Sequence, residues 1–180
     1  MVKTNLKEIK NLIKSKDYQK AIINTHDLVQ LVIYQGIISA LWFLGEEYEM
    51  KKYLRKIMKV SKKKTFREKE IERALELQII NDKDLRSIKG IKDLRDSIIS
   101  HYSTYFNSET DAEGEKKDEV IEIINAGEKV IHKLQEISDR IGVARIKESR
   151  DFFNNSAFKV ADYIHLGNSQ KDLLELISKK

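Results

Sequence analysis

Leu28–Gly45 reads LVQLVIYQGIISALWFLG and contains no charged residue. Its length is close to the lower limit for a helix that crosses a membrane. Three polar side chains interrupt the stretch, at Gln30, Gln35 and Ser39, and the basic residues outside it do not favour one flank over the other. A helix at the centre of a bundle explains this pattern better. We therefore expect no membrane contact, and attachment through Leu28–Gly45 ranks last among the alternatives.

The helix that holds this stretch is expected to begin upstream of it. Asp17 occupies the position of an N-cap, and apolar residues follow at intervals of three and four from Ala21 to Leu41. Gly36 and Ala40 lie one turn apart and leave room for another helix to approach closely. The first half is apolar on one side and the second half nearly all round, as in a helix buried on most faces or at a subunit interface.

The composition of the whole chain also predicts long helices with few connections. The chain has 180 residues, no proline and seven glycines, whereas turns favour Gly, Pro, Asn and Asp. Apolar residues make up 41% and charged residues 35%, as in a globular domain rather than a disordered chain. The predicted fold is all-α, a bundle of about five to seven helices.

Apolar spacing and break signals divide the chain into elements. A short first helix is expected to end near Ser15. Further helices are expected at residues 46–60, 65–80, 82–104, 118–141 and 169–178. Thr65 with Glu68, and Ser169 with Asp172, have the spacing of N-terminal caps. Residues 107–117 are predicted to form a polar loop. Because the pattern weakens after residue 141, we expect a bundle at 1–141 and a helical extension at 142–180.

Charge is spread unevenly over a chain whose net charge is +5. Lys51–Lys69 holds eight lysines and two arginines against a single acid, Glu68. Such a segment could meet phosphates or an acidic partner, or it could simply be a solvated surface. The N-terminal residues carry charges throughout and do not resemble a signal peptide. Cysteine is absent, which suits a cytoplasmic protein.

No cofactor or metal ion is expected. The histidines are His26, His101, His132 and His165, and none has the three- or four-residue spacing of a helical metal pair. Cysteine thiolates are excluded as ligands, and neither a glycine-rich phosphate loop nor a nucleophile elbow occurs.

Ile91–Phe106, IKDLRDSIISHYSTYF, carries the candidate catalytic residues. Arg95, Asp96 and His101 lie in an otherwise apolar helical pattern. Histidine transfers protons near neutral pH, and arginine presents planar donors matched to phosphate. Together they suit metal-independent RNA cleavage, which needs acid–base catalysis and a positive charge on the phosphorane-like transition state.

Helical geometry separates the two groups within one chain. Six residues place His101 about 120° round from Arg95 and about 9 Å along the axis. Three arrangements could close this distance: a long reach of the arginine side chain, a helix end near Ser100, or the same helix of a second subunit.

The string R-D-S-I-I-S-H from Arg95 to His101 resembles the signature of the HEPN superfamily. That signature is an arginine, commonly followed by Asn, Asp or His, and a histidine after four to six intervening residues; this chain has five. The resemblance covers residues 17–141. It implies a HEPN-like fold and a metal-independent endoribonuclease that acts as a toxin or phage-defence protein, with arginine and histidine meeting across a homodimer interface. By that resemblance Arg95 stabilises the phosphate, His101 is the acid–base group and Asp96 positions them.

The expected partners are RNA, a second copy of the chain, and an antitoxin or defence-system protein. The candidate RNA-binding residues are Tyr102, Tyr105, Lys62, Lys63 and Lys64. The chain departs from the family pattern two residues after the histidine, where Ser103 replaces a tyrosine. The role of Tyr102 and Tyr105 therefore stays open.

The alternative is a non-catalytic helical interaction or nucleic-acid-binding module, such as an antitoxin, effector subunit or regulator. The second helix would then be its association surface, because so apolar a helix needs cover.

Overall fold

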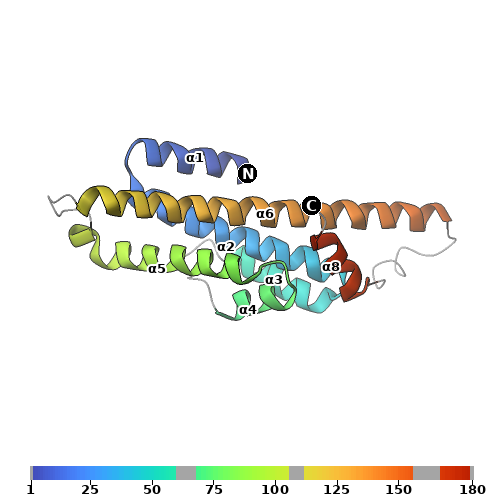
Figure 1. The fold of residues 1–180 in the computed structure, drawn as a ribbon. Helices are drawn as coiled ribbons and strands as arrows, with labels where there is room; N and C mark the ends of the chain where they lie inside the picture. Colours follow the sequence, from blue (N-terminus) through green and yellow to red (C-terminus); the bar gives the residue numbers. More distant parts are fainter. Residues whose placement is uncertain (1, 60–67, 106–111, 156–166, 179–180) are drawn as a thin grey trace. The chain divides into compact units, whose positions relative to one another are not determined.

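The computed structural model describes residues 2–59, 68–105, 112–155 and 167–178. Within these ranges the regular structure is entirely helical, which confirms the predicted all-α bundle (Figure 1). Its helices are α1 (Val2–Lys14), α2 (Tyr18–Phe43), α3 (Glu47–Lys59), α4 (Glu68–Glu76), α5 (Asp82–Tyr105), α6 (Ala112–Asn155) and α8 (Gln170–Ser178). None of these helices is long and apolar enough to cross a membrane.

The helices form two compact units, and both α2 and α6 contribute to each. Unit 1 consists of Met1–Leu31 and Asp82–His132, and unit 2 of Val32–Asn81 and Lys133–Lys180. Most apolar side chains of the charge-free stretch are buried inside the chain, as expected of a central helix, although Trp42 is exposed. The alternative in which α2 is an association surface loses its main support, because this helix already has cover.

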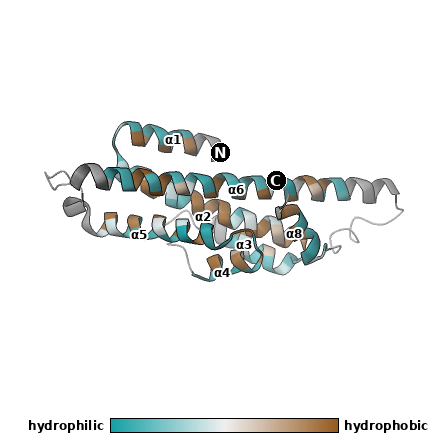
Figure 2. Cartoon of the chain, in the orientation of Figure 1, coloured by the Kyte–Doolittle hydropathy of each residue, from teal (hydrophilic) through white to brown (hydrophobic). Residues whose placement is uncertain are grey.

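Unit 1 is built on the buried faces of α1, α2, α5 and α6. The apolar side of α1 alternates with its charged side in Figure 2, as in an amphipathic helix. Lys10 on α1 pairs with Glu128 on α6 at 2.6 Å. The core contains Leu6, Ile9, Ala21, Ile22, Leu28, Val29, Ile88, Ile91, Leu94, Ile98, Val120, Ile124, Val130 and Ile131.

Unit 2 packs the second half of α2 against α3, α4, α6 and α8. Gly36 provides the predicted close approach, because a Cβ at this position would lie 3.0 Å from Ile79 Cδ1 and 3.7 Å from Leu134 Cδ2. Tyr53 of α3 packs against Tyr34 of α2 with 6.2 Å between ring centroids. The remaining core includes Val32, Ile33, Ile37, Leu41, Phe43, Ile71, Leu77, Ile137, Ile141 and Leu173.

Two N-terminal caps predicted from the sequence are confirmed. Asp17 Oδ1 accepts a hydrogen bond from the backbone N–H of Lys20 at 3.2 Å, at the start of α2. At α8 the cap is reciprocal: the Asp172 N–H donates to Ser169 Oγ at 3.2 Å, and the Ser169 N–H donates to Asp172 Oδ2 at 3.0 Å.

α4 ends four residues before the predicted end at Ile80. Gln78 adopts the left-handed conformation, with φ of 56°, although it is not a glycine. Its N–H donates to the Leu75 carbonyl at 2.8 Å, and the Ile79 N–H donates to the Ala74 carbonyl at 3.1 Å. This is a Schellman motif, which satisfies the last carbonyls of a helix and stops it. The predicted partner Thr65 of Glu68 lies outside the described residues.

The predicted polar loop at 107–117 was wrong for residues 112–117, which form the first turns of α6. Glu113 and Lys117 are four residues apart, a spacing that supports a helix, and acidic residues suit the positive end of the helix dipole. α6 then continues through Gly142, beyond the boundary expected at residue 141, and ends at Asn155.

Candidate functional site

α5 carries the candidate site of unit 1 and runs without a break to Tyr105. Asp82 and Asp84 in its first turn suit the positive end of the helix dipole. Ile88, Ile91 and Leu94 lie at helical spacing on its buried face, and Ile98 continues the same stripe. This stripe fixes the rotation of α5 and hence the direction of its described side chains.

Arg95 lies beside the buried stripe and is held by its neighbour Asp96. Its Nη1 donates to Asp96 Oδ1 at 2.9 Å, and the two side chains are 18% and 46% exposed. Adjacent residues on a helix point about 100° apart, so the long arginine side chain bends round to reach the carboxylate. Arg95 Nε is buried and has no hydrogen-bond partner among the described residues.

Position 101 lies on the other side of the buried stripe. Because α5 is continuous from residue 95 to residue 101, the two positions are about 120° apart and about 9 Å apart along the axis. Ile98, which is fully buried, lies between them. The guanidinium of Arg95 is turned toward Asp96 and therefore away from position 101. A helix end near Ser100, one of the three ways to bring the groups together, is excluded.

The structure thus brings together Arg95 and Asp96 among the predicted site residues. The structure does not describe Lys62, Lys63 and Lys64. For His101, Tyr102 and Tyr105 it describes the backbone but not the side chains. The backbone of the last three belongs to α5.

Ile99 is exposed on α5, one turn after Arg95. Its side chain is 51% exposed, and helical geometry places it within about 40° of Arg95. Arg86, nine residues before Arg95, lies on the opposite side of the same helix and is exposed to solvent. Ile99 therefore marks the side of α5 that carries Arg95, and Arg86 marks the opposite side.

His26 is fully buried on α2. Its Nδ1 lies 3.0 Å from Asp27 Oδ1. His132 is exposed, and its Nε2 lies 3.7 Å from Glu128 Oε1. The described residues contain no group of three or more His, Cys, Asp or Glu side chains that could hold a metal ion.

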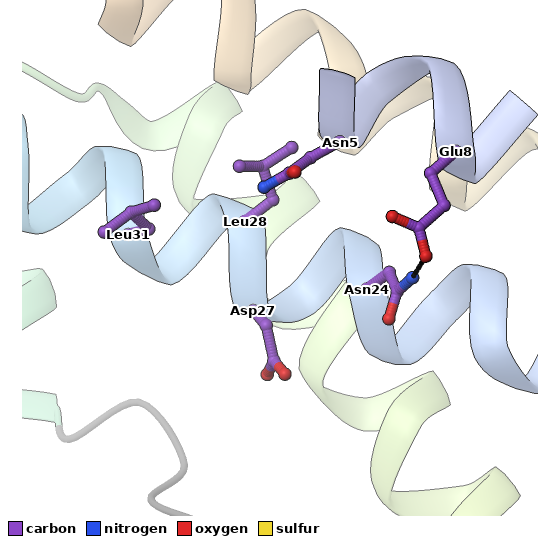
Figure 3. A pocket seen from close by; sticks show the side chains of 6 residues that line it. All are labelled: Asn5, Glu8, Asn24, Asp27, Leu28 and Leu31. Carbon is purple, nitrogen blue, oxygen red and sulfur yellow. Dashed lines mark hydrogen bonds between the residues drawn. The ribbon is translucent and has the colours of Figure 1, made fainter. Parts of the chain in front are cut away.

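A pocket of about 290 Å³ opens between α1 and α2 in unit 1 (Figure 3). Asn24 Nδ2 donates to Glu8 Oε1 at 3.4 Å across it, and Asp27 and Asn5 complete the polar lining. Carboxylates repel an anion, so this pocket does not suit a phosphate. A second pocket, in unit 2, is lined by Glu148, Asp172 and Glu175, and these carboxylates make it unsuited to a phosphate as well.

Unit 2 contains two clusters that sequence reasoning missed. Arg145 of α6 is 2% exposed, and its Cζ lies 5.7 Å from the ring centroid of Trp42. In α4, Glu70 is buried near Tyr53. The pKa of the Tyr53 phenol is raised, mainly because the phenol is buried and also because Glu70 carries a negative charge. Both clusters join residues distant in sequence, so helical periodicity alone contained no signal for them.

No family model, curated protein or solved structure matches the chain.

Proposed function

We propose that this protein is a metal-independent endoribonuclease of HEPN type, possessing a composite site of Arg95 and His101 at a homodimer interface. Its biological role would be that of a toxin or phage-defence protein. The observation that carries the proposal is the state of Arg95, which is mostly buried and held by one carboxylate, with a buried N–H that no described residue accepts.

An unsatisfied buried donor costs about 1–3 kcal/mol, so it persists where another interaction repays it. A phosphate would do so. If the guanidinium releases Asp96 and turns, Nε–H and an Nη–H present the paired donors that match two phosphate oxygens. The pair with Asp96 can exchange for a phosphate, because the Asp96 carboxylate is half exposed and water can solvate it once it is released.

The second subunit supplies what one chain lacks. Ile98 separates positions 95 and 101, and Arg95 leans toward Asp96, so one α5 does not direct both groups at the same phosphate. A two-fold axis beside α5 would let Arg95 of one copy face His101 of the other. The exposed Ile99 is available on the Arg95 side of the helix for such a contact.

In the mechanism, a histidine removes the proton from the 2′-hydroxyl or protonates the leaving 5′-oxygen, while arginine stabilises charge on the phosphate. General acid–base catalysis contributes about 10²–10⁴-fold to a rate, and one preorganised donor about 10²–10³-fold. Asp96 holds Arg95 in place before RNA binds.

The test is incubation of purified protein with RNA in EDTA. The parent should cleave, and Arg95→Ala and His101→Ala should each lose at least about 100-fold in rate. Arg86→Ala is the matched control, since it removes an exposed arginine from the far side of α5 and should cleave like the parent. Equal activity in all four proteins, or none in the parent, would refute the nuclease and favour a non-catalytic interaction module.

A further inference from the structure

One helix of unit 2 has a side whose chemistry the α5 site does not use. α3 buries Tyr53, which packs against Tyr34 of α2 in the core of unit 2. On the opposite side Tyr48 and three cations, Lys51, Lys52 and Arg55, lie at intervals of three and four residues. All four side chains are exposed.

Tyr48 is the most exposed of the large apolar side chains described, at 82%. Single exposed aromatic residues are ordinary on protein surfaces. The surroundings of Tyr48 are less ordinary, because it lies in line with Arg55, two turns and about 10 Å along the helix. An aromatic ring flanked by cations is the arrangement that binds single-stranded nucleic acid, where bases stack on rings and cations follow the phosphates.

The acidic residues of α3 leave this line open. Lys51 Nζ pairs with Glu47 Oε1 at 2.6 Å, and Lys52 Nζ pairs with Glu49 Oε2 at 3.1 Å. Glu47 and Glu49 lie on opposite flanks of Tyr48, about 100° to either side, so the pairs draw the two lysines apart. Exposed pairs of this kind contribute little to stability and can exchange for phosphate. Arg55 forms no ion pair with any residue that the structure describes.

We propose that the outward side of α3, formed by Tyr48, Lys51, Lys52 and Arg55, binds single-stranded RNA, with an unpaired base stacked on Tyr48. The choice of RNA rests on the proposed function, but the surface itself rests on α3 alone. Double-stranded RNA does not offer the face of a base, so it would engage the cations only. An anionic membrane fits less well, because the large apolar side chains that α3 is described as exposing are Tyr48 and Leu54 alone, whereas Tyr53 is buried in the core of unit 2.

The experiment measures fluorescence anisotropy of a labelled single-stranded 12-nucleotide RNA in EDTA, with every variant in a His101→Ala background that prevents cleavage. Tyr48→Ala should weaken binding about 5- to 150-fold, the range expected for one lost stacking contact. Tyr48→Phe keeps the ring and should bind like the background protein. Arg55→Ala should lower the slope of log affinity against log salt by about 0.7, the value for one lost phosphate contact on a single strand.

Matched controls separate this inference from general electrostatics. Arg86→Ala removes a cation from α5 and should leave the affinity unchanged, and Tyr48→Ala should not affect binding of a duplex of the same sequence. Equal single-strand affinity for Tyr48→Ala and the background protein overturns the proposal. The proposal is also overturned if Tyr48→Ala weakens only the binding of the protein to anionic phosphatidylserine vesicles and leaves RNA binding unchanged. Because this experiment measures binding and not cleavage, the α3 proposal can be refuted while Arg95-dependent cleavage is observed. Equally, RNA can bind at α3 while Arg95-dependent cleavage is absent.

Discussion

Gly127 of α6 lies directly against Ile91 of α5, so that a Cβ on Gly127 would be 2.6 Å from Ile91 Cδ1. The same Cβ would be 2.8 Å from Thr25 Cγ2 on α2. Three helices of unit 1 therefore meet at a position where no side chain fits. Arg95 follows Ile91 by one turn, so this contact also sets the rotation of the candidate site.

The first prediction is that Gly127→Ala destabilises the protein. Thr25 cannot move aside, because its Oγ1 donates to the Ala21 carbonyl at 2.7 Å and its side chain is stiff at χ1. Overpacking of this kind costs about 1–3 kcal/mol, which exceeds the gain of up to about 1 kcal/mol from replacing glycine with alanine in a helix. The melting temperature should fall by a few degrees, at about 2–4 °C per kcal/mol for this chain length.

Gly142→Ala is the control on the same helix. A Cβ there would meet nothing within 4 Å, so the helix should gain stability by up to about 1 kcal/mol. Opposite shifts in the melting temperatures of the two variants support the close contact at Gly127. Stabilisation by both substitutions would contradict it.

The features that sequence reasoning predicted correctly depend on neighbouring residues. The caps formed by Asp17 and by Ser169 with Asp172 need only a side chain that reaches a backbone N–H two or three residues away. The end of α4 was missed because Gln78 takes a conformation that glycine usually takes. Its positive φ is supported by tertiary packing of Ile79, which the local sequence does not reveal.

The candidate site was predictable in content but not in arrangement. The string from Arg95 to His101 indicated which groups could act, and the 100° turn per residue indicated that they diverge. It could not indicate that Arg95 leans toward Asp96 or that its Nε is left without a partner. The burial of His26 was not predictable for the same reason, because it depends on the helices that surround α2 rather than on α2 itself.

The second prediction concerns Arg145, which is buried against Trp42 and lies 3.6 Å from Glu148. Arg145→Ala should destabilise the protein by about 1–3 kcal/mol, because it removes the packing of a long side chain and the cation beside a carboxylate. Arg145→Lys should restore only part of the loss, since an ammonium cannot stack on the indole as a planar guanidinium does.

Trp42 is the single tryptophan of the chain, so its fluorescence reports unfolding in denaturant directly. Lys147→Ala removes an exposed cation two residues from Arg145 and should leave the unfolding midpoint nearly unchanged. A midpoint for Arg145→Ala equal to that of Lys147→Ala would mean that the arginine does not support the packing of unit 2.

The third prediction is that both aspartate caps weaken in acid. A hydrogen bond from the Lys20 side chain lowers the pKa of Asp17 below its usual value of 3.8, and the hydrogen bond with the Ser169 side chain lowers the pKa of Asp172 in the same way. A carboxyl group with a lower pKa in the folded protein stabilises the fold at pH values above 3.8. That contribution disappears as the pH falls through the folded-state pKa.

Melting temperatures measured between pH 5 and pH 2.5 test this dependence. Asn keeps an oxygen for capping but does not titrate, so the double variant Asp17→Asn, Asp172→Asn should lose less stability over this interval than the parent. Asp17→Ala, which removes the α2 cap, should cost about 0.5–2 kcal/mol at neutral pH. Identical pH profiles for the parent and the double Asn variant would show that these two carboxylates do not control the acid response.

The fourth prediction tests how the proposed site is shared between subunits. Arg95→Ala and His101→Ala proteins are each expected to be inactive, but mixing them after dissociation and reassociation should restore cleavage. Random pairing makes half of the dimers mixed, and each mixed dimer holds one site with both residues intact, so activity should approach about a quarter of that of the parent. Recovery requires that Arg95 and His101 act from different chains. If mixing restores nothing while both variants still dimerise, the two residues act within one chain, and Arg95 must then swing away from Asp96 to reach round the helix past Ile98.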